Sequence, residues 1–163
     1  MRAYVGVGSN LGDRWRWLAH AARQLRIIPG ISVLRASRVY ESAALGPPGQ
    51  PRYLNAALEI ETALPPARLL AALQRIEASA LRRRDVRWGA RTLDLDLLLY
   101  GGRTIRTPQL TVPHPALGGR RFVLEPLGEL CPEAVVPGAG ATVTELLHAV
   151  PPHDMRVMGL FPM

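Results

Sequence analysis

The stretch TLDLDLLLY, residues 92–100, constrains both the fold and the chemistry of this chain. Alternation of acidic and apolar residues predicts a β-strand, in which residues two apart point to the same face. Asp94 and Asp96 therefore lie side by side, and Leu98 and Tyr100, which follow on their face, predict that this face is covered there. The leucines of the opposite face are expected in the core: Leu93, Leu95, Leu97 and Leu99.

Two neighbouring carboxylates at the mouth of a covered region repel each other, so either one takes up a proton or cations neutralise both. Carboxylate oxygens bind Mg²⁺, typically together with substrate phosphates. A solvated strand face with two exposed acids is the alternative. Arginines upstream favour phosphate chemistry over it, although they also suit a solvated loop. They are Arg82, Arg83, Arg84, Arg87 and Arg91.

The pattern on both sides of this strand predicts an α+β fold. The expected order is strand 3–8, helix 13–28, strand 31–42, strand 53–64, helix 65–83 and strand 92–100. This βαββαβ order favours a ferredoxin-like core, with an antiparallel sheet and both helices on one face. A C-terminal hairpin around residues 101–107, a Pro-rich turn at 110–115 and helices at 121–130 and 142–150 are expected to cover the other face or an edge.

Composition narrows the possible function. The chain of 163 residues is expected to form a single domain, residues 1–163, and its lone Cys131 offers no disulfide framework. Net charge is +7, and all 20 basic residues are Arg. An Arg-rich genome accounts for most of the missing Lys, and an anionic partner is the functional alternative. Without Lys, a P-loop and a protein-kinase site are both excluded.

The glycine-rich start, GVGSNLG at residues 6–12, does not match the Rossmann fingerprint because Leu11 occupies its third glycine position. A tight strand-to-helix turn explains these glycines. No apolar run approaches the roughly 20 residues of a membrane span. We therefore expect a cytoplasmic protein without a membrane partner.

Five sequence blocks together resemble the 6-hydroxymethyl-7,8-dihydropterin pyrophosphokinase family. They are GSNLGDR (8–14), GPPGQPRYLNAALEIET (46–62), LQRIEASALRR (73–83), RWGARTLDLDLLLY (87–100) and LTVPHP with RRFVLEPLGEL (110–130). The resemblance implies transfer of pyrophosphate from ATP to the hydroxymethyl group of the pterin, with release of AMP, in folate biosynthesis. The hydroxyl oxygen would attack the β-phosphorus.

The resemblance also implies residue roles. Asp94 and Asp96 match the ligands of two Mg²⁺ ions, one between the pterin hydroxyl and the α-phosphate and one bridging the β- and γ-phosphates. Arg82 and Arg91 match catalytic arginines that contact the phosphates. The ATP-contacting positions are Gln74, Arg84, Thr111, His114 and Arg120, and the pterin-binding positions are Ser42, Leu45, Tyr53, Asn55, Trp88 and Phe122. Glu77 matches an acid that lines the site.

Other interpretations remain open at this level. Phe122 alone favours a core residue, and His114 alone an ordinary turn residue. A basic ferredoxin-like domain also suits RNA binding, although aromatic residues are only 6% of the chain and Asp94 and Asp96 would repel a phosphate backbone. A catalytically inactive relative is a third possibility, against which both aspartates and Arg91 argue. We expect a monomer that binds ATP and 6-hydroxymethyl-7,8-dihydropterin, and no nucleic acid.

Overall fold

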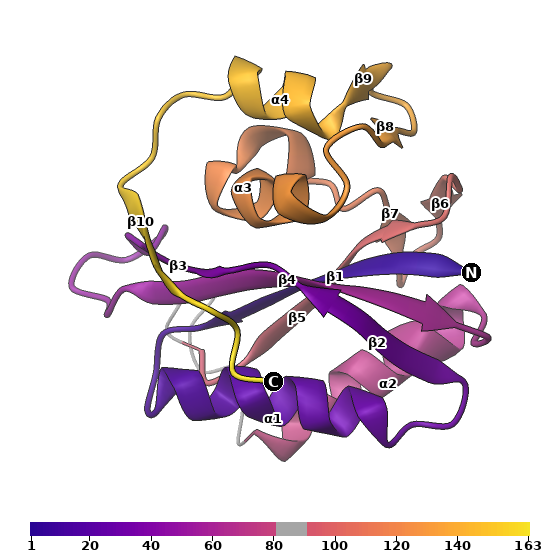
Figure 1. The fold of residues 1–163 in the computed structure, drawn as a ribbon, viewed down its shortest axis with the longest axis horizontal. Helices are drawn as coiled ribbons and strands as arrows, with labels where there is room; N and C mark the ends of the chain where they lie inside the picture. The colour runs from indigo at the N-terminus through magenta and orange to yellow at the C-terminus, as the bar shows by residue number, and fades with distance from the viewer. Residues whose placement is uncertain (81–90) are drawn as a thin grey trace.

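The computed structural model describes residues 1–80 and 91–163, in which a central sheet has helices on both faces (Figure 1). Helices α1 and α2 cover one face, and α3 and α4 lie over the other. The strands of the sheet are β1 (Arg2–Ser9), β2 (Ile31–Ala36), β3 (Val39–Ser42), β4 (Tyr53–Thr62), β5 (Asp94–Tyr100) and β10 (Met155–Gly159). The helices are α1 (Arg14–Arg26), α2 (Pro66–Ser79), α3 (Arg121–Leu130) and α4 (Val143–Ala149).

Within the described residues the sheet has the order β10-β3-β4-β1-β5, and β2 pairs with β4 as well. Every one of these pairs is antiparallel. The expected α+β fold with an antiparallel sheet is therefore confirmed. The register places Gly8 of β1 opposite both Asn55 on β4 and Asp94 on β5. Three strands thus bring separate parts of the sequence to one level of the sheet.

The helices form where local sequence favours them. Asp13 caps α1, because its carboxylate accepts a hydrogen bond from the Arg16 backbone N–H at 3.2 Å. Pro66 occupies the first turn of α2, where its missing N–H costs nothing. Thr142 and Glu145 form a reciprocal capping box at the start of α4. These signals are local, which is why the sequence located the helices well.

The prediction of a single strand over residues 31–42 was wrong, because this segment forms two strands, β2 and β3. Ser37 lies at the break. Its hydroxyl accepts a hydrogen bond from the Ala57 backbone N–H at 2.9 Å and donates one to the Arg38 carbonyl at 2.8 Å. A side chain thus replaces a backbone partner in the ladder, and both segments still pair with β4.

The prediction of which sheet face the last side chains of β5 occupy was also wrong. The pairing of β1 with β5 shifts register between Tyr4 and Val5, so Leu98 is an extra residue in a β-bulge. Beyond the bulge the side chains exchange faces. Leu99 joins the apolar cluster around α3, whereas Tyr100 joins the one that contains α1 and α2. Leu93, Leu95 and Leu97 lie in the core cluster as expected.

Of the glycines at the start of the chain, Gly12, with φ of +76°, lies in the expected turn between β1 and α1. Gly6 and Gly8 lie inside β1, so the turn does not explain them. A Cβ atom on Gly8 would approach the Asn55 side-chain oxygen to 3.1 Å. The bare backbone of β1 therefore leaves room for other side chains above the sheet.

The C-terminal third builds the second layer and one sheet edge. A hairpin of β6 (Ile105–Arg106) and β7 (Thr111–Val112) lies further along the chain than expected, and a short 3-10 turn, η1 (Leu117–Gly119), leads into α3. The expected helices at 121–130 and 142–150 are confirmed. Strands β8 (Val135–Val136), β9 (Ala141–Thr142) and β10 were not foreseen. In the described parts of the chain, no helix has the length and apolarity that crossing a membrane requires.

Candidate active site

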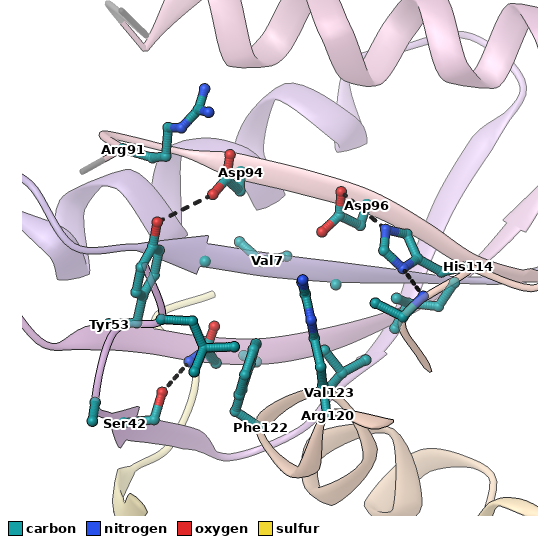
Figure 2. A pocket seen from close by; sticks show the side chains of 18 of the residues that line it. Val7, Ser42, Tyr53, Arg91, Asp94, Asp96, His114, Arg120, Phe122 and Val123 are labelled. Atoms are coloured by element: carbon teal, nitrogen blue, oxygen red, sulfur yellow. Dashed lines mark hydrogen bonds and ion pairs between the residues drawn. The ribbon is translucent and has the colours of Figure 1, made fainter. Parts of the chain in front are cut away.

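A pocket of about 390 Å³ lies between the sheet and the start of α3 (Figure 2). Small-molecule sites typically have volumes of roughly 300–1,000 Å³. Its floor is β1, where Gly6, Val7 and Gly8 line it. Residues from β3, β4, β5, the turn after β7 and α3 form the walls. The pocket therefore collects segments from most of the chain at one place.

The acidic wall comes from β5. Asp94 and Asp96 both line the pocket, as residues two apart on one strand should. The Tyr53 hydroxyl lies 3.5 Å from Asp94 Oδ2, and Asp96 Oδ1 lies 3.8 Å from His114 Nε2 (Figure 2). The side chain of Asp96 is 50% exposed. Both carboxylates thus reach the same open space, with Asp96 the more accessible.

His114 has a defined orientation. The ring Nδ1 accepts a hydrogen bond from the Ala116 backbone N–H at 3.2 Å, and the backbone N–H of His114 donates to the Leu98 carbonyl at 3.0 Å. Because Nδ1 accepts a hydrogen bond, the proton of a neutral ring lies on Nε2. That nitrogen is the one on the Asp96 side. His114 can therefore donate a hydrogen bond into the pocket.

The opposite wall is aromatic and amide-rich. Phe122, at the start of α3, and Tyr53, at the start of β4, both line the pocket. Asn55 also lies on β4, and its side-chain amide donates a hydrogen bond of 2.7 Å to the hydroxyl of Ser42 at the end of β3. The Arg120 guanidinium lies over the Phe122 ring, 5.7 Å from its centroid. A flat ring with polar edges would find both stacking surfaces and hydrogen-bonding groups here.

Asn10 links the two walls, a role that the sequence did not reveal. Its side-chain Oδ1 accepts a hydrogen bond from the Arg91 backbone N–H at 2.7 Å, and its backbone N–H donates to the Arg91 carbonyl at 3.0 Å. The side-chain amide also donates to the Pro51 carbonyl at 3.0 Å. Asn10 is 1% exposed. A buried amide thus fixes the segment before β5 against the segment before β4.

Glu77 supports β5 from the helical side. This acid of α2 is buried, and its Oε1 accepts a hydrogen bond from the Leu95 backbone N–H at 2.8 Å. Leu95 stands between the two aspartates on a strand at the edge of the sheet. The acid that was expected to line the site therefore contacts the strand that carries Asp94 and Asp96.

A buried carboxylate also lies next to Ser42. Glu41 is 6% exposed and pairs with Arg14 and Arg156, each at 2.9 Å, and with Arg52 at 3.3 Å. Burial alone would raise the pKa of Glu41, but hydrogen bonds from Arg14 and Arg156 outweigh it and hold the pKa below its ordinary value. Glu41 is therefore a permanently charged anchor for three segments at neutral pH.

The structure brings many of the predicted site residues into this one pocket. They are Ser42, Leu45, Tyr53, Asn55, Arg91, Asp94, Asp96, His114, Arg120 and Phe122. Gln74 lies on an exposed face of α2, and Thr111 lines a neighbouring hollow that shares His114 with the first, so neither contributes to this pocket. Arg82, Arg84 and Trp88 lie outside the described residues.

Comparison with known proteins identifies the family. The family described as 7,8-dihydro-6-hydroxymethylpterin-pyrophosphokinase (HPPK) matches residues 4–132. The chain belongs to this family. A Synechocystis relative named 2-amino-4-hydroxy-6-hydroxymethyldihydropteridine pyrophosphokinase is 43% identical over 148 residues, which cover 91% of this chain and 75% of the relative. A Haemophilus influenzae relative of the same name is 42% identical over 153 residues, covering 94% and 95%.

Solved structures agree in fold. A Plasmodium falciparum HPPK-DHPS structure with pteroate superposes with a TM-score of 0.71 at 14% identity, over 90% of this chain. The chain spans 42% of the length of that structure. The family match and these relatives together confirm, at the level of the family, the pyrophosphokinase resemblance predicted from the sequence.

The donor set in the HPPK pocket suits magnesium. Asp94 and Asp96 offer hard oxygen ligands on one face, and Mg²⁺ is usually bound by one or two carboxylates plus substrate phosphates. Among residues 1–80 and 91–163, no group of three or more His, Cys, Asp or Glu side chains is placed to hold a metal. The Nη1 of Arg91 is buried without a hydrogen-bond partner in the described residues. Phosphate oxygens would supply the remaining metal ligands and would accept a hydrogen bond from this arginine.

Proposed function

We propose that this chain transfers pyrophosphate from ATP to 6-hydroxymethyl-7,8-dihydropterin, giving the pterin diphosphate and AMP in folate biosynthesis. The pterin hydroxyl oxygen attacks the β-phosphorus of ATP, and AMP leaves. The observation that carries the proposal is the pocket in which an aspartate pair faces aromatic side chains, in a member of the HPPK family. One wall suits a metal-bound triphosphate and the other a flat heteroaromatic ring.

The side chains of the pocket divide this work. Tyr53 and Phe122 stack on the pterin ring, and Asn55 and Ser42 read its polar edge. The Nε2–H of His114 and the guanidinium groups of Arg91 and Arg120 donate to phosphate oxygens as negative charge builds up at the β-phosphorus. Leu45 contributes to the pterin pocket. Fixed donors need no rearrangement during the reaction, which lowers its barrier.

Other assignments extend the proposal beyond the described pocket. We infer that Arg82 contacts phosphates, that Gln74, Arg84 and Thr111 contact ATP, and that Trp88 contacts the pterin, as the family resemblance implies.

We further infer that Asp94 and Asp96 hold two Mg²⁺ ions. When bound, such ions neutralise phosphate oxygens and polarise the attacking hydroxyl. Asp94 and Asp96 supply the negative charge that keeps them beside the triphosphate.

At the level of the whole chain, we propose a single pyrophosphokinase domain, residues 1–163, that acts as a cytoplasmic monomer. The order β5-β1-β4 followed by β2 and β3 supports a ferredoxin-like core in which the second strand is divided. The proposal includes no nucleic-acid partner, because the acidic pair would repel a phosphate backbone.

An AMP-release assay tests the proposal. AMP should form from ATP only when the hydroxymethylpterin and Mg²⁺ are both present, and the pterin diphosphate should appear in equal amount. Methylated pterin lacking the hydroxyl is the matched control, because it can stack but cannot attack phosphorus. AMP formation that does not depend on the pterin, or its absence under all conditions, would contradict the proposed reaction and favour an inactive relative.

A further inference from the structure

We infer that His153, just before the C-terminal strand, is a positioning residue of the pterin pocket. This inference rests on the proposed function. His153 follows Ser42 by more than a hundred residues, and neither the family match over residues 4–132 nor any sequence pattern points to it.

Two contacts join His153 to the pocket wall. Its Nε2–H donates a hydrogen bond of 3.2 Å to the Ala43 carbonyl, and its ring lies against Phe122 with centroids 5.3 Å apart and planes at 48°. Ala43 and Phe122 both line the pocket, whereas His153 does not. His153 thus contacts two parts of the wall from outside the pocket.

These two parts belong to separate elements. Ala43 directly follows β3 and lies between Ser42 and Leu45, two predicted pterin-binding positions, and Phe122 lies in the first turn of α3 on the other layer. Within the described residues, His153 bonds to one and packs on the other. It therefore sets how far the pterin-reading backbone lies from the ring that would stack on the pterin.

His153 is itself held in place. The Ala43 N–H donates to the Asp154 carbonyl at 3.0 Å, and Met155 of β10 pairs with Ser42 of β3. Arg52 forms an ion pair with Asp154 at 2.8 Å, and Arg156 reaches Glu41 at 2.9 Å. Backbone pairing and two ion pairs thus fix the chain directly after His153, where β10 begins (β10 in Figure 1).

The role predicts a substrate-specific effect. His153→Ala removes both contacts, so the pterin site loosens while the acidic wall on β5 keeps its support. We expect pterin affinity to fall about tenfold, with the KM for ATP and kcat changed by less than about twofold. His153→Phe keeps a ring against Phe122 but loses the bond to Ala43, and should weaken the pterin about threefold.

The experiment measures pterin binding by its own fluorescence, with Mg²⁺ and a nonreactive ATP analogue present, and KM for both substrates in the AMP-release assay. His148→Ala is the matched control, because His148 lies exposed near the end of α4, away from the pocket lining. Thermal melting of each variant reports on folding. If His153→Ala does not fold, His153→Phe decides the question through its pterin affinity.

Each outcome has a clear meaning. Weaker pterin binding with unchanged ATP parameters supports the role. Unchanged pterin affinity in the variants, or an equal loss of affinity for both substrates, overturns the role of His153. In either case, turnover by the wild-type protein leaves the proposed function standing. Wild-type protein that binds no pterin overturns both.

Discussion

At the scale of the residue, the aspartate pair gains its meaning from what surrounds it. Asp94 and Asp96 lie in a pocket wall with His114 and Arg120 rather than on an open strand face. Like charges on one strand face repel each other, and a bound cation would reduce that repulsion. The position of the pair therefore supports the proposed metal and phosphate binding.

Replacing one carboxylate tests this explanation. Asp96→Asn preserves shape but removes the charge, so we expect kcat to fall about 100- to 1,000-fold, equivalent to roughly 3–4 kcal/mol of barrier. Melting temperature should stay within about 2 °C of wild type, because Asp96 is exposed. Steady-state AMP release measures the effect, with exposed Glu133→Gln as the control. A variant that keeps a third of wild-type turnover would contradict the metal role.

Asn10 acts on stability at the same scale. Asn10→Ala leaves the Arg91 N–H without its acceptor in the folded state, so unfolding should become easier by about 1–3 kcal/mol. Urea unfolding followed by circular dichroism measures the loss. Gln109→Ala removes an exposed amide and should change the free energy of unfolding by less than about 0.5 kcal/mol. Equal stability of the two variants would show that the Asn10 link contributes nothing.

At the scale of the element, buried carboxylates join segments that apolar packing alone would leave apart. Glu41 on β3 binds arginines from α1, from the segment before β4 and from β10. Glu59 on β4 binds Arg2 of β1 and Arg35 of β2. Burial opposes the charge of Glu59, yet hydrogen bonds from Arg35 and Arg2 keep its pKa below the ordinary value. These anchors make the sheet sensitive to acid.

The pH dependence follows from the direction of these shifts. A carboxylate whose pKa is lower in the folded state stabilises the protein above its unfolded pKa, and loses that contribution as pH falls through the folded pKa. The free energy of unfolding should therefore decline below about pH 4.5, the ordinary value for Glu. Glu41→Gln weakens hydrogen bonds from partly exposed arginines, so it should cost about 2 kcal/mol at neutral pH and flatten the decline. Urea titrations at several pH values measure this, and an equally steep decline in the variant would contradict it.

At the scale of the whole molecule, the pocket is assembled from both layers. The floor and acidic wall come from the sheet, and Phe122 and Arg120 come from the start of α3. A ligand that fills this space contacts segments spread over most of the chain, so its binding should stabilise the entire fold.

Ligand binding should raise the melting temperature of the whole protein. Saturation by the Mg²⁺ complex of a nonreactive ATP analogue, at about 100 times its dissociation constant, should add about 2.7 kcal/mol, or roughly 5–10 °C in Tm. A chelator should abolish the part of this shift that depends on Mg²⁺. The double variant that combines Asp94→Asn with Asp96→Asn should show only the Tm shift that the wild type shows in chelator, whether or not Mg²⁺ is present. A full shift in the presence of chelator would argue against carboxylate-bound magnesium.

Local patterns predicted a large part of this molecule. The sequence predicted the helix over residues 121–130, and alternation put Asp94 and Asp96 on one face of β5. The same reasoning was wrong about Leu99 and Tyr100, because the bulge at Leu98 depends on the partner strand β1. It also missed β10, since an edge strand is decided by pairing with β3 far earlier in the chain.

The sequence by itself determined the helices, the antiparallel sheet, the aspartate pair and the family to which the chain belongs. Periodicity, capping and residue chemistry act over a few positions, so they can be read along the chain. Only the tertiary structure decided that Asn10 holds Arg91, that Glu77 holds Leu95 and that His153 joins Ala43 to Phe122. Such contacts form between residues far apart in sequence, and their geometry exists only after the sheet has set its register.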